Sequence, residues 1–332
     1  MYSRSIKFLG ALLVAVTLTL ASMPTARAQN TAAATTVANG ATCTAASNMY
    51  WEIGDLNGVI VSGRRGLLAP QRTTDLVLAS ASQWILGAYL LEVHGGPAPQ
   101  AQRDAARMLS GYPQFDYSLC ATSDTVADCF HRIGNHSHDP ALDGHFYYSG
   151  GNSQYLATDS TLLDLGLLTT AELSQTMQST LGISMAYDDP TLSAMLKGSA
   201  ASYAEFLKKL MKSPQDGGLV MHDYLGHDPV ATLPCPTGHG GCTPGGNAAW
   251  HYGDHYWIED NADPGEITIG SETVPVLVGD GAFSSLGAFG FYPWISADKQ
   301  YYGIIARRTI LGSGYLQSIK CGQAIRQAFF TP

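Results

Sequence analysis

Three polar residues stand at the start of an apolar helical segment. The stretch LASASQWILGAYLLE (residues 78–92) begins with Ser80, Ser82 and Gln83 and continues with apolar residues at helical spacing. A serine at the N-terminus of a helix can act as a cap. Alternatively its oxygen can react there, because unpaired backbone N–H groups and the positive end of the helix dipole stabilise a developing oxyanion. The sequence therefore raises two roles for these residues, capping and catalysis.

Three strings occur in the order of the motifs of a known superfamily. They are VLASASQWI (residues 77–85), FYYSGGNSQYLA (146–157) and SSLGAFGFYPWISADKQYYGIIARR (284–308), and GSAASYAEFLKKL (198–210) resembles a helix that follows the second motif. By their order and spacing they resemble the serine β-lactamase, DD-peptidase and esterase superfamily over nearly the whole chain after the N-terminal segment.

This resemblance implies a two-lobe α/β fold of the serine β-lactamase/transpeptidase type. An antiparallel sheet flanked by helices would form one lobe (45–95 and 255–332), a helical lobe would span 96–254, and the site would lie between them. Ser80 falls on the nucleophile, Tyr148 on the tyrosine that shuttles the proton, and Ser285-Leu286-Gly287 on the strand triplet. Backbone N–H groups of Ser80 and of the Gly287–Ala288 segment would form the oxyanion hole.

Two departures from the superfamily pattern remove positive charge from the expected site. The first motif is S-x-x-K, but Gln83 stands where the lysine is usual, and Ser285 stands where the third motif has lysine or histidine. A neutral amide can orient Ser80 by hydrogen bonds, but it cannot take its proton. General-base assistance contributes about 10²–10⁴-fold. A Ser80–Tyr148 pair without an ammonium should therefore acylate slowly.

Two functions follow from this reading. The first is acyl transfer or hydrolysis of a small ester, amide or peptide-like ligand through Ser80, with no cofactor. The alternative is a non-catalytic superfamily member that binds an envelope ligand or partner in the same cleft. The sequence leaves the substrate and the oligomeric state open.

Other residue patterns predict less chemistry. The literal S-x-x-K of Ser296 to Lys299 lies in a polar turn between two predicted strands, and Lys208 lies on the polar side of a helix. The histidines lack an H-E-x-x-H motif, so a metal site is the weaker reading. His145, close to Tyr148 in sequence, is the histidine that could serve as a substitute base.

The predicted elements place strands at both ends of the chain. Residues 49–66 read as two strands around Asn57-Gly58, a strong hairpin signal, and strands return between 255 and 308 before a final helix at 314–330. The spacing of Thr169 to Glu172 and of Ser202 to Glu205 predicts capping boxes at two helices between them. The two groups of strands should complete one antiparallel sheet.

All six cysteines lie beyond residue 28, and an even count favours disulfides. Six cysteines allow 15 connectivities. Proximity in the sequence favours Cys120–Cys129 and Cys235–Cys242, which leaves Cys43 and Cys321 to join the two ends. A zinc site is the rival interpretation, but the chain has no C-x-x-C pair.

The N-terminal residues 1–28 read as a secretory signal peptide, with a basic start, an apolar run and the A-x-A signal at Ala26-Arg27-Ala28. A polar Ala/Thr-rich spacer (29–44) would then precede the domain at 45–332. Removing residues 1–28 takes away three basic residues and no acid, so the formal charge falls from −9 to −12. We therefore expect a secreted or periplasmic protein with no membrane span after signal removal and no nucleic-acid partner.

Overall fold

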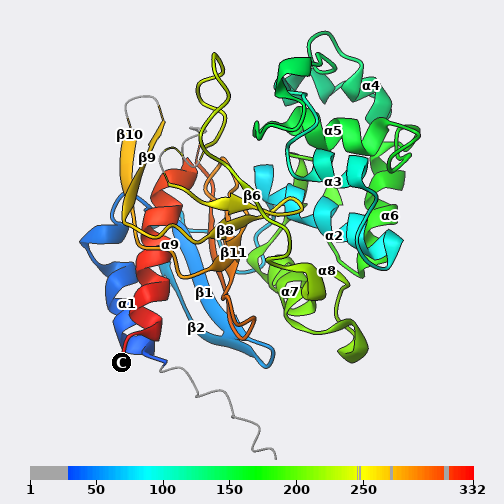
Figure 1. Ribbon diagram of the computed structural model, residues 1–332. Helices are drawn as coiled ribbons and strands as arrows, with labels where there is room; N and C mark the ends of the chain where they lie inside the picture. Colours follow the sequence, from blue (N-terminus) through cyan, green and yellow to red (C-terminus); the bar gives the residue numbers. More distant parts are fainter. Residues whose placement is uncertain (1–28, 245, 247, 270–271, 310–313) are drawn as a thin grey trace, which may run out of the picture.

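The computed structural model describes residues 29–244, 246, 248–269, 272–309 and 314–332 (Figure 1). The predicted signal peptide lies outside these residues. A central antiparallel sheet has the strand order β2-β1-β13-β12-β11-β8-β7-β6. Its strands are β1 (Met49–Asp55), β2 (Gly58–Arg65), β6 (Val230–Ala231), β7 (His251–Tyr252), β8 (Trp257–Glu259), β11 (Ala282–Ser284), β12 (Tyr292–Ile295) and β13 (Tyr302–Arg307). The prediction of one antiparallel sheet built from both ends of the chain is confirmed.

The hairpin of β1 and β2 turns at Asn57-Gly58, as the sequence predicts. The Asp55 side chain accepts hydrogen bonds from the backbone N–H groups of Asn57 and Gly58, at 2.7 and 3.2 Å. Gly58 has a φ of +138°, a value that residues with a Cβ rarely adopt. β1 then pairs with β13 over six residues, which joins the first and the last parts of the chain.

Alternating residues of β13 pack into two different cores. Tyr302, Ile304 and Ala306 pack with the helices on one face of the sheet, whereas Ile305 packs with those on the other. Side chains of a strand point alternately to opposite faces. A fully buried strand such as β13 must therefore be apolar at nearly every position, and its sequence is YGIIAR.

Helices cover both faces of this sheet (Figure 1). α1 (Thr31–Asn39) and α9 (Gly314–Phe330) lie side by side on one face, and α2 (Ser82–His94), α7 (Ala200–Met211) and α8 (Met221–Tyr224) pack on the other. The other helices gather beyond α2. They are α3 (Gln100–Ala106), α4 (Val126–Phe130), α5 (Gly150–Thr158) and α6 (Thr170–Leu181).

Two small sheets flank the main one. β3 (Leu76–Val77), β5 (Leu196–Gly198) and β4 (Ala186–Tyr187) form a three-stranded sheet, in which β3 directly precedes the segment that contains Ser80. β9 (Gly265–Ile269) and β10 (Glu272–Val276) form a separate hairpin. Through the pairing of β3 with β5, the segment that leads into residue 80 is held by residues more than a hundred positions later in the chain.

One of the two predicted capping boxes is confirmed. Thr169 is the N-cap of α6, and its side chain and that of Glu172 exchange hydrogen bonds with each other's backbone. The second prediction is wrong: α7 begins three residues earlier, with Ser199 as N-cap and Ser202 closing the box. The hydroxyl of the serine at the third helical position accepts a hydrogen bond, as a glutamate carboxylate would there, and it also donates one. The S-x-x-E pattern does not detect this variant of the capping box.

The stretch predicted as a spacer (29–44) is instead part of the fold. It contains α1 and the 3₁₀ turn Ala41–Cys43, and Ala34 and Ala38 are fully buried against α9. Small alanines allow the two helices to approach closely, but they give little hydrophobic signal in the sequence. A second boundary also moves, because the chain re-enters the central sheet at Val230 rather than at 255. β6 and β7 have two residues each, too few to show a strand pattern.

Three disulfides join the cysteines: Cys43–Cys321, Cys120–Cys129 and Cys235–Cys242. These are the pairs that proximity in the sequence favours. The first connects the turn after α1 to α9 and so fixes the N-terminal segment to the C-terminal helix. Within the described residues, no helix is both long enough and apolar enough to cross a membrane.

Candidate functional site

The segment that contains Ser80 turns sharply before α2. Residues Ala79–Ala81 form a 3₁₀ turn, and Ala79 has a φ of +48°, in the left-handed region that residues with a Cβ avoid. The Ser82 hydroxyl donates to the carbonyl of Ala79 at 2.6 Å and is fully buried. Ser80 is only partly buried and lines a cleft. The two serines therefore have different roles: Ser82 holds the turn, and Ser80 faces the open space.

Neighbouring elements fix this turn in place. The hydroxyl of Tyr203, from α7, donates to the carbonyl of Ala81 at 2.9 Å. The N–H of Leu78 donates to Leu196 of β5. A Cβ at Gly87, one turn into α2, would clash with the backbone of Asp254, so the helix can lie this close to the β7–β8 turn only with glycine there. The position of Ser80 is thus set by both lobes.

Tyr148 reaches the same cleft from the start of α5. Its N–H donates to the carbonyl of Cys242 at 2.8 Å, so the loop closed by Cys235–Cys242 holds the tyrosine backbone. The next residue, Ser149, is the N-cap of α5 and accepts from the N–H of Gly151. Because the N-cap of the helix directly follows Tyr148, this tyrosine lies at the N-terminal end of α5 rather than on its side.

Gln83 is almost completely buried and is held by a residue that the sequence analysis did not single out. The Tyr252 hydroxyl donates to its Oε1 at 2.9 Å. A hydrogen bond from Gln83 also lowers the pKa of the Tyr148 phenol. Gln83 thus connects Tyr252 to Tyr148, whose ring packs edge-on against that of Tyr252.

The electrostatics of Tyr148 keep it protonated. Burial raises the pKa of its phenol to about 12, and hydrogen bonds from Ser80, Gln83 and Trp257 lower it only in part. All three partners are neutral, so no cation in this group favours the tyrosinate. At pH 8 about one molecule in 10,000 would carry the ionised phenol, the form that can accept a proton from Ser80.

The segment after β11 contains Ser285, Gly287 and Ala288, which were predicted to bind the oxyanion or the substrate. Ser285 and Gly287 depart from this prediction. Ser285 is 3% exposed, and its hydroxyl donates to the carbonyl of Ser80 at 3.3 Å instead of lining the cleft. The N–H of Gly287 donates to Phe291 at 2.8 Å, so it is not available for an oxyanion. A Cβ at Gly287 would clash with the carbonyl of Leu78, so this glycine allows the close approach of the strand to the turn that contains Ser80. Of the three, only Ala288 borders the cleft beside Ser80.

Two hollows meet at Ser80, Tyr148 and Ala288. The larger has a volume of about 420 Å³ and extends over Gln83 toward Phe115, Tyr117 and Phe289. The smaller, of about 150 Å³, is closed by Pro244, Leu286 and Tyr315. A carbonyl placed over Ser80 would therefore have room for one substituent on each side.

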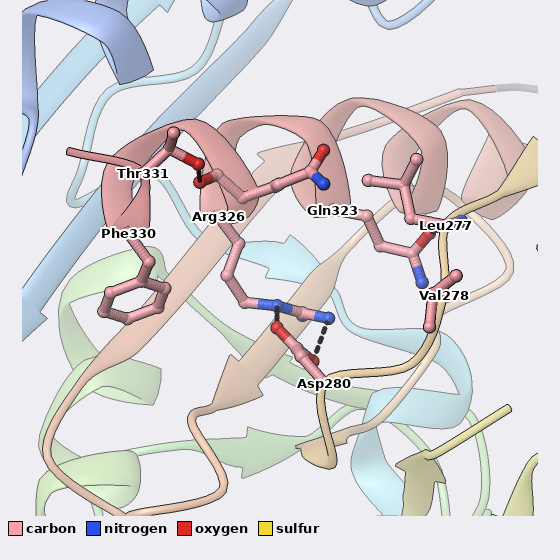
Figure 2. A pocket seen from close by; sticks show the side chains of 8 residues that line it. Leu277, Val278, Asp280, Gln323, Arg326, Phe330 and Thr331 are labelled. Atoms are coloured by element: carbon pink, nitrogen blue, oxygen red, sulfur yellow. Dashed lines mark hydrogen bonds and ion pairs between the residues drawn. The ribbon is translucent and has the colours of Figure 1, made fainter. Parts of the chain in front are cut away.

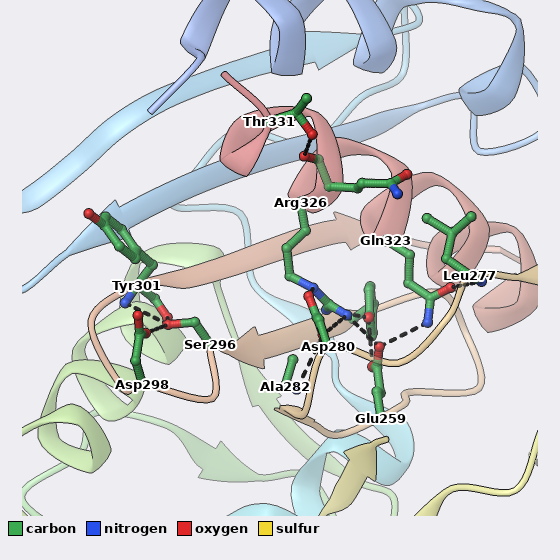
Figure 3. Close-up of polar contacts among 12 residues, drawn as sticks. Glu259, Leu277, Asp280, Ala282, Ser296, Asp298, Tyr301, Gln323, Arg326 and Thr331 are labelled. Atoms are coloured by element: carbon green, nitrogen blue, oxygen red, sulfur yellow. Dashed lines mark hydrogen bonds and ion pairs between the residues drawn. The ribbon is translucent and has the colours of Figure 1, made fainter. Parts of the chain in front are cut away.

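The literal S-x-x-K motif does not lie in this cleft. The Ser296 hydroxyl donates to Asp298 at 2.6 Å in the β12–β13 turn, beside Tyr301 (Figure 3). The Lys299 ammonium donates to the carbonyl of His222 in α8, at 2.6 Å. Lys208 pairs with Glu205 on the surface of α7. None of these residues lines either hollow, so none supplies an ammonium beside Ser80.

The histidines do not converge on a metal site. Within the part of the chain that the structure describes, no group of three or more His, Cys, Asp or Glu side chains could hold an ion. His145 is exposed and lines neither hollow, so the idea that it could serve as a substitute base is wrong. His255 is fully buried, with a φ of +67° and no hydrogen-bond partner at either ring nitrogen.

Tyr252 and Trp257 are the site residues that sequence reasoning missed. Both come from HYGDHYW (residues 251–257), a stretch that also contains two of the histidines weighed for a metal site. The dense run of aromatic residues was the available signal, since buried Tyr and Trp usually present their polar atoms to a partner. Here those partners are Gln83 and Tyr148.

Several solved structures have an architecture similar to that of this chain. A class C beta-lactamase from Rhodobacter sphaeroides superposes with a TM-score of 0.59 at 13% identity, over 90% of this chain and 99% of that one. EstCE1, a hydrolase with promiscuous acyltransferase activity, gives 0.58 at 12% identity over 90% and 98%. A penicillin-binding protein homolog from Caulobacter crescentus gives 0.54 at 11% identity over 90% and 97%.

The chain has the serine β-lactamase/penicillin-binding protein fold. No protein-family model and no curated protein matches the sequence. At this level of identity the likeness concerns the fold, so the chemistry of the cleft rests on the residues described above.

Proposed function

We propose that this protein is an exported serine hydrolase-like enzyme that forms an acyl-enzyme at Ser80 from a small ester, amide or peptide-like compound. The observation that carries the proposal is the meeting of Ser80, Gln83 and Tyr148 in one cleft, where the Tyr148 phenol interacts with both other side chains. A strained left-handed residue directly before Ser80 supports it, since such strain gathers at functional turns.

The mechanism uses this chain's own groups and no cofactor. Ser80 Oγ attacks the carbonyl carbon, and the N–H groups of Ser80 and Ala288 stabilise the oxyanion that forms. The serine proton passes to the Tyr148 oxygen and from there to the leaving alcohol or amine. Water then attacks the acyl-enzyme by the reverse route and releases the acid. Gln83, fixed by Tyr252, orients the phenol.

The same groups make acylation slow at neutral pH. A neutral Tyr148 with a pKa of about 12 is a poor proton acceptor, and Gln83 adds no charge that would lower this value. The loss of general-base assistance costs about 10²–10⁴-fold in rate, whereas the oxyanion hole alone retains some rate.

A second function is favoured by that weakness. The protonated phenol, with no ammonium among the described residues that line the cleft, also fits a non-catalytic protein that binds an envelope ligand or partner in the same cleft. Both functions are proposed for a protein exported to an oxidising compartment, the periplasm or the outside of the cell. The predicted signal peptide and the three disulfides support that location.

The decisive experiment is covalent labelling of Ser80. The purified protein is incubated with a fluorophosphonate at pH 9, and the intact mass and the labelled peptide are measured. We expect one adduct per chain on the peptide that contains Ser80, none in Ser80→Ala, and labelling retained in Ser193→Ala, a serine that also lines the cleft. No adduct on Ser80, combined with no Ser80-dependent ester hydrolysis, would favour the binding function.

A further inference from the structure

The cleft beside Ser80 contains no formal charge. Among the described residues that line the two hollows there is no Asp, Glu, Lys, Arg or His. The walls are aromatic, aliphatic or neutral polar, with Phe115, Tyr117 and Phe289 around the larger hollow and Leu286 and Tyr315 around the smaller one. A ligand in either hollow therefore meets no counter-ion.

Asp116 stands between Phe115 and Tyr117 in the sequence, but it is an anion, and its carboxylate accepts from the N–H and the hydroxyl of Ser118. Asp188 and Lys197, on the loop that carries Ser193 and Ala194, form an ion pair with each other at 2.5 Å. On the opposite wall, Ser285 takes the position where a cation was expected and turns its hydroxyl to the backbone of Ser80. Neither wall can offer a cation to a carboxylate without breaking an existing contact.

An unpaired carboxylate would be costly in such a place. Moving an ionised carboxylate out of water without a partner costs several kcal/mol, whereas an apolar group gains about 25 cal/mol for each Å² removed from water. An aromatic or aliphatic group would gain further from the rings that surround the larger hollow. The cleft should therefore discriminate by charge more strongly than by detailed shape.

The volumes limit the two halves of the ligand. A dry protein cavity of about 150 Å³ is large enough for benzene, and the smaller hollow has this volume. The larger hollow is nearly three times that size, at about 420 Å³, and one of its walls, Tyr117, remains 45% exposed. One substituent of the carbonyl is thus restricted to about six non-hydrogen atoms, while the other can extend to the solvent.

We propose that the cleft selects uncharged, apolar esters and excludes compounds that carry a carboxylate on either side of the reacting carbonyl. This deepens the proposed function, on which it rests for the reacting carbonyl. Phe115, Tyr117 and Phe289 hold the larger apolar substituent, and Pro244, Leu286 and Tyr315 hold the smaller one. Carboxylates of the kind found at peptide C-termini are thus poor ligands for this protein.

Equilibrium binding to the Ser80→Ala variant tests this selection without turnover. The probes are phenyl pentanoate and monophenyl glutarate, which differ by a methyl against a carboxylate, together with methyl phenyl glutarate as a neutral polar control. Titration calorimetry should show both neutral esters binding at least 100-fold more tightly than the carboxylate. Equal affinities within threefold, or binding of none of the three, would overturn the proposal.

A charge placed in the wall should reverse the preference. Ala194 lines the larger hollow and is partly buried. Ala194→Lys should improve the binding of monophenyl glutarate at least tenfold, and Ala194→Met, of similar length but neutral, should not. Failure of both the selectivity and this rescue counts against the proposal.

Wild-type turnover separates this inference from the proposed function. If phenyl pentanoate binds selectively but is not hydrolysed, the cleft selects neutral ligands and the catalytic function fails. If it is hydrolysed through Ser80 but monophenyl glutarate reacts equally well, catalysis stands and the selection is wrong.

Discussion

Two buried polar clusters lie near opposite ends of α9, and they differ in whether their side chains carry formal charges. The cleft cluster consists of Ser80, Gln83, Tyr148 and Tyr252 and carries no formal charge. The second cluster (Glu259, Asp280, Tyr292, Gln323 and Arg326) is charged and lies under a hollow of about 210 Å³ near the C-terminus of α9 (Figures 2 and 3). Tyr315, which borders the cleft, is 11 residues from Arg326, or about 16 Å along the helix.

The charged cluster is fully paired. The Arg326 guanidinium lies 2.7 Å from Glu259 and 2.8 Å from Asp280, and Glu259 also accepts from Tyr292 and Gln323. Figure 2 shows the Arg326 side chain directed at Asp280, and its other hydrogen bonds go to Glu259 and Tyr292. In this protein, charge is buried where partners surround it, whereas the described lining of the cleft contains no cation that could stabilise an ionised group.

Breaking the charged cluster should have the largest effect. Arg326→Met leaves the Glu259 carboxylate, which is fully buried, without its cation, and this should lower the free energy of unfolding by about 3–5 kcal/mol. Urea denaturation followed by circular dichroism measures the loss. Asp280→Asn is the matched control, because this carboxylate is 31% exposed and its removal should cost less than about 1 kcal/mol. Equal losses in the two variants would contradict the comparison.

Introducing a charge into the neutral cluster should have the next largest effect. In Gln83→Lys the Tyr252 hydroxyl can accept from the new ammonium, which would lower the pKa of Tyr148 and restore a proton acceptor for Ser80. We expect the rate of ester hydrolysis at pH 7.5 to rise about 100-fold, measured with a p-nitrophenyl ester and corrected for Ser80→Ala. Gln83→Met, similar in length but neutral, should show no gain.

The dependence of the hydrolysis rate on pH tests whether ionised Tyr148 is the proton acceptor. The reactive form has Tyr148 ionised, and its pKa of about 12 lies above the usable range. The wild-type rate should therefore rise about tenfold per pH unit between pH 7 and 10 without levelling off, whereas the Gln83→Lys rate should reach a plateau within that range. A wild-type plateau near neutral pH would mean that another group is the base.

His255 offers a test of a buried group with neither charge nor partner. Burial lowers the pKa of its imidazole to about 3. Between this value and the ordinary pKa of about 6.5, the unfolded chain binds a proton that the folded chain does not, so stability falls as the pH falls. His255→Phe should remove about 2 kcal/mol of the difference in unfolding free energy between pH 7 and pH 5. An unchanged difference would show that His255 finds a partner in solution.

Of the four residues substituted in these predictions, Tyr252 should show the smallest effect. Tyr252→Phe removes the donor that holds the Gln83 amide, so the amide can rotate away from Tyr148. We expect a loss of about fivefold in the rate of Ser80 acylation, roughly 1 kcal/mol, with an unchanged affinity for neutral ligands. A loss of affinity equal to the loss of rate would indicate a packing role instead.

The sequence predicted the parts of the site that depend on order along the chain. Ser80, Gln83 and Tyr148 were found because short strings keep their order, and the sheet because its strands are apolar runs. It could not predict that Gly287 serves packing or that Ser285 turns away, because both depend on how closely the strand approaches Leu78. The helix at 31–39 was missed for a related reason: alanines that pack well give little hydrophobic signal.

The topology also constrains how the chain can be assembled as it emerges from the N-terminal end. β1 and β2 form early, but the neighbour of β1 in the sheet is β13, about 250 residues later. Cys120–Cys129 can close locally, whereas Cys43 must wait for Cys321. During synthesis the first hairpin therefore stays without its partner strand, with its apolar side chains open to incorrect association, until the last residues arrive.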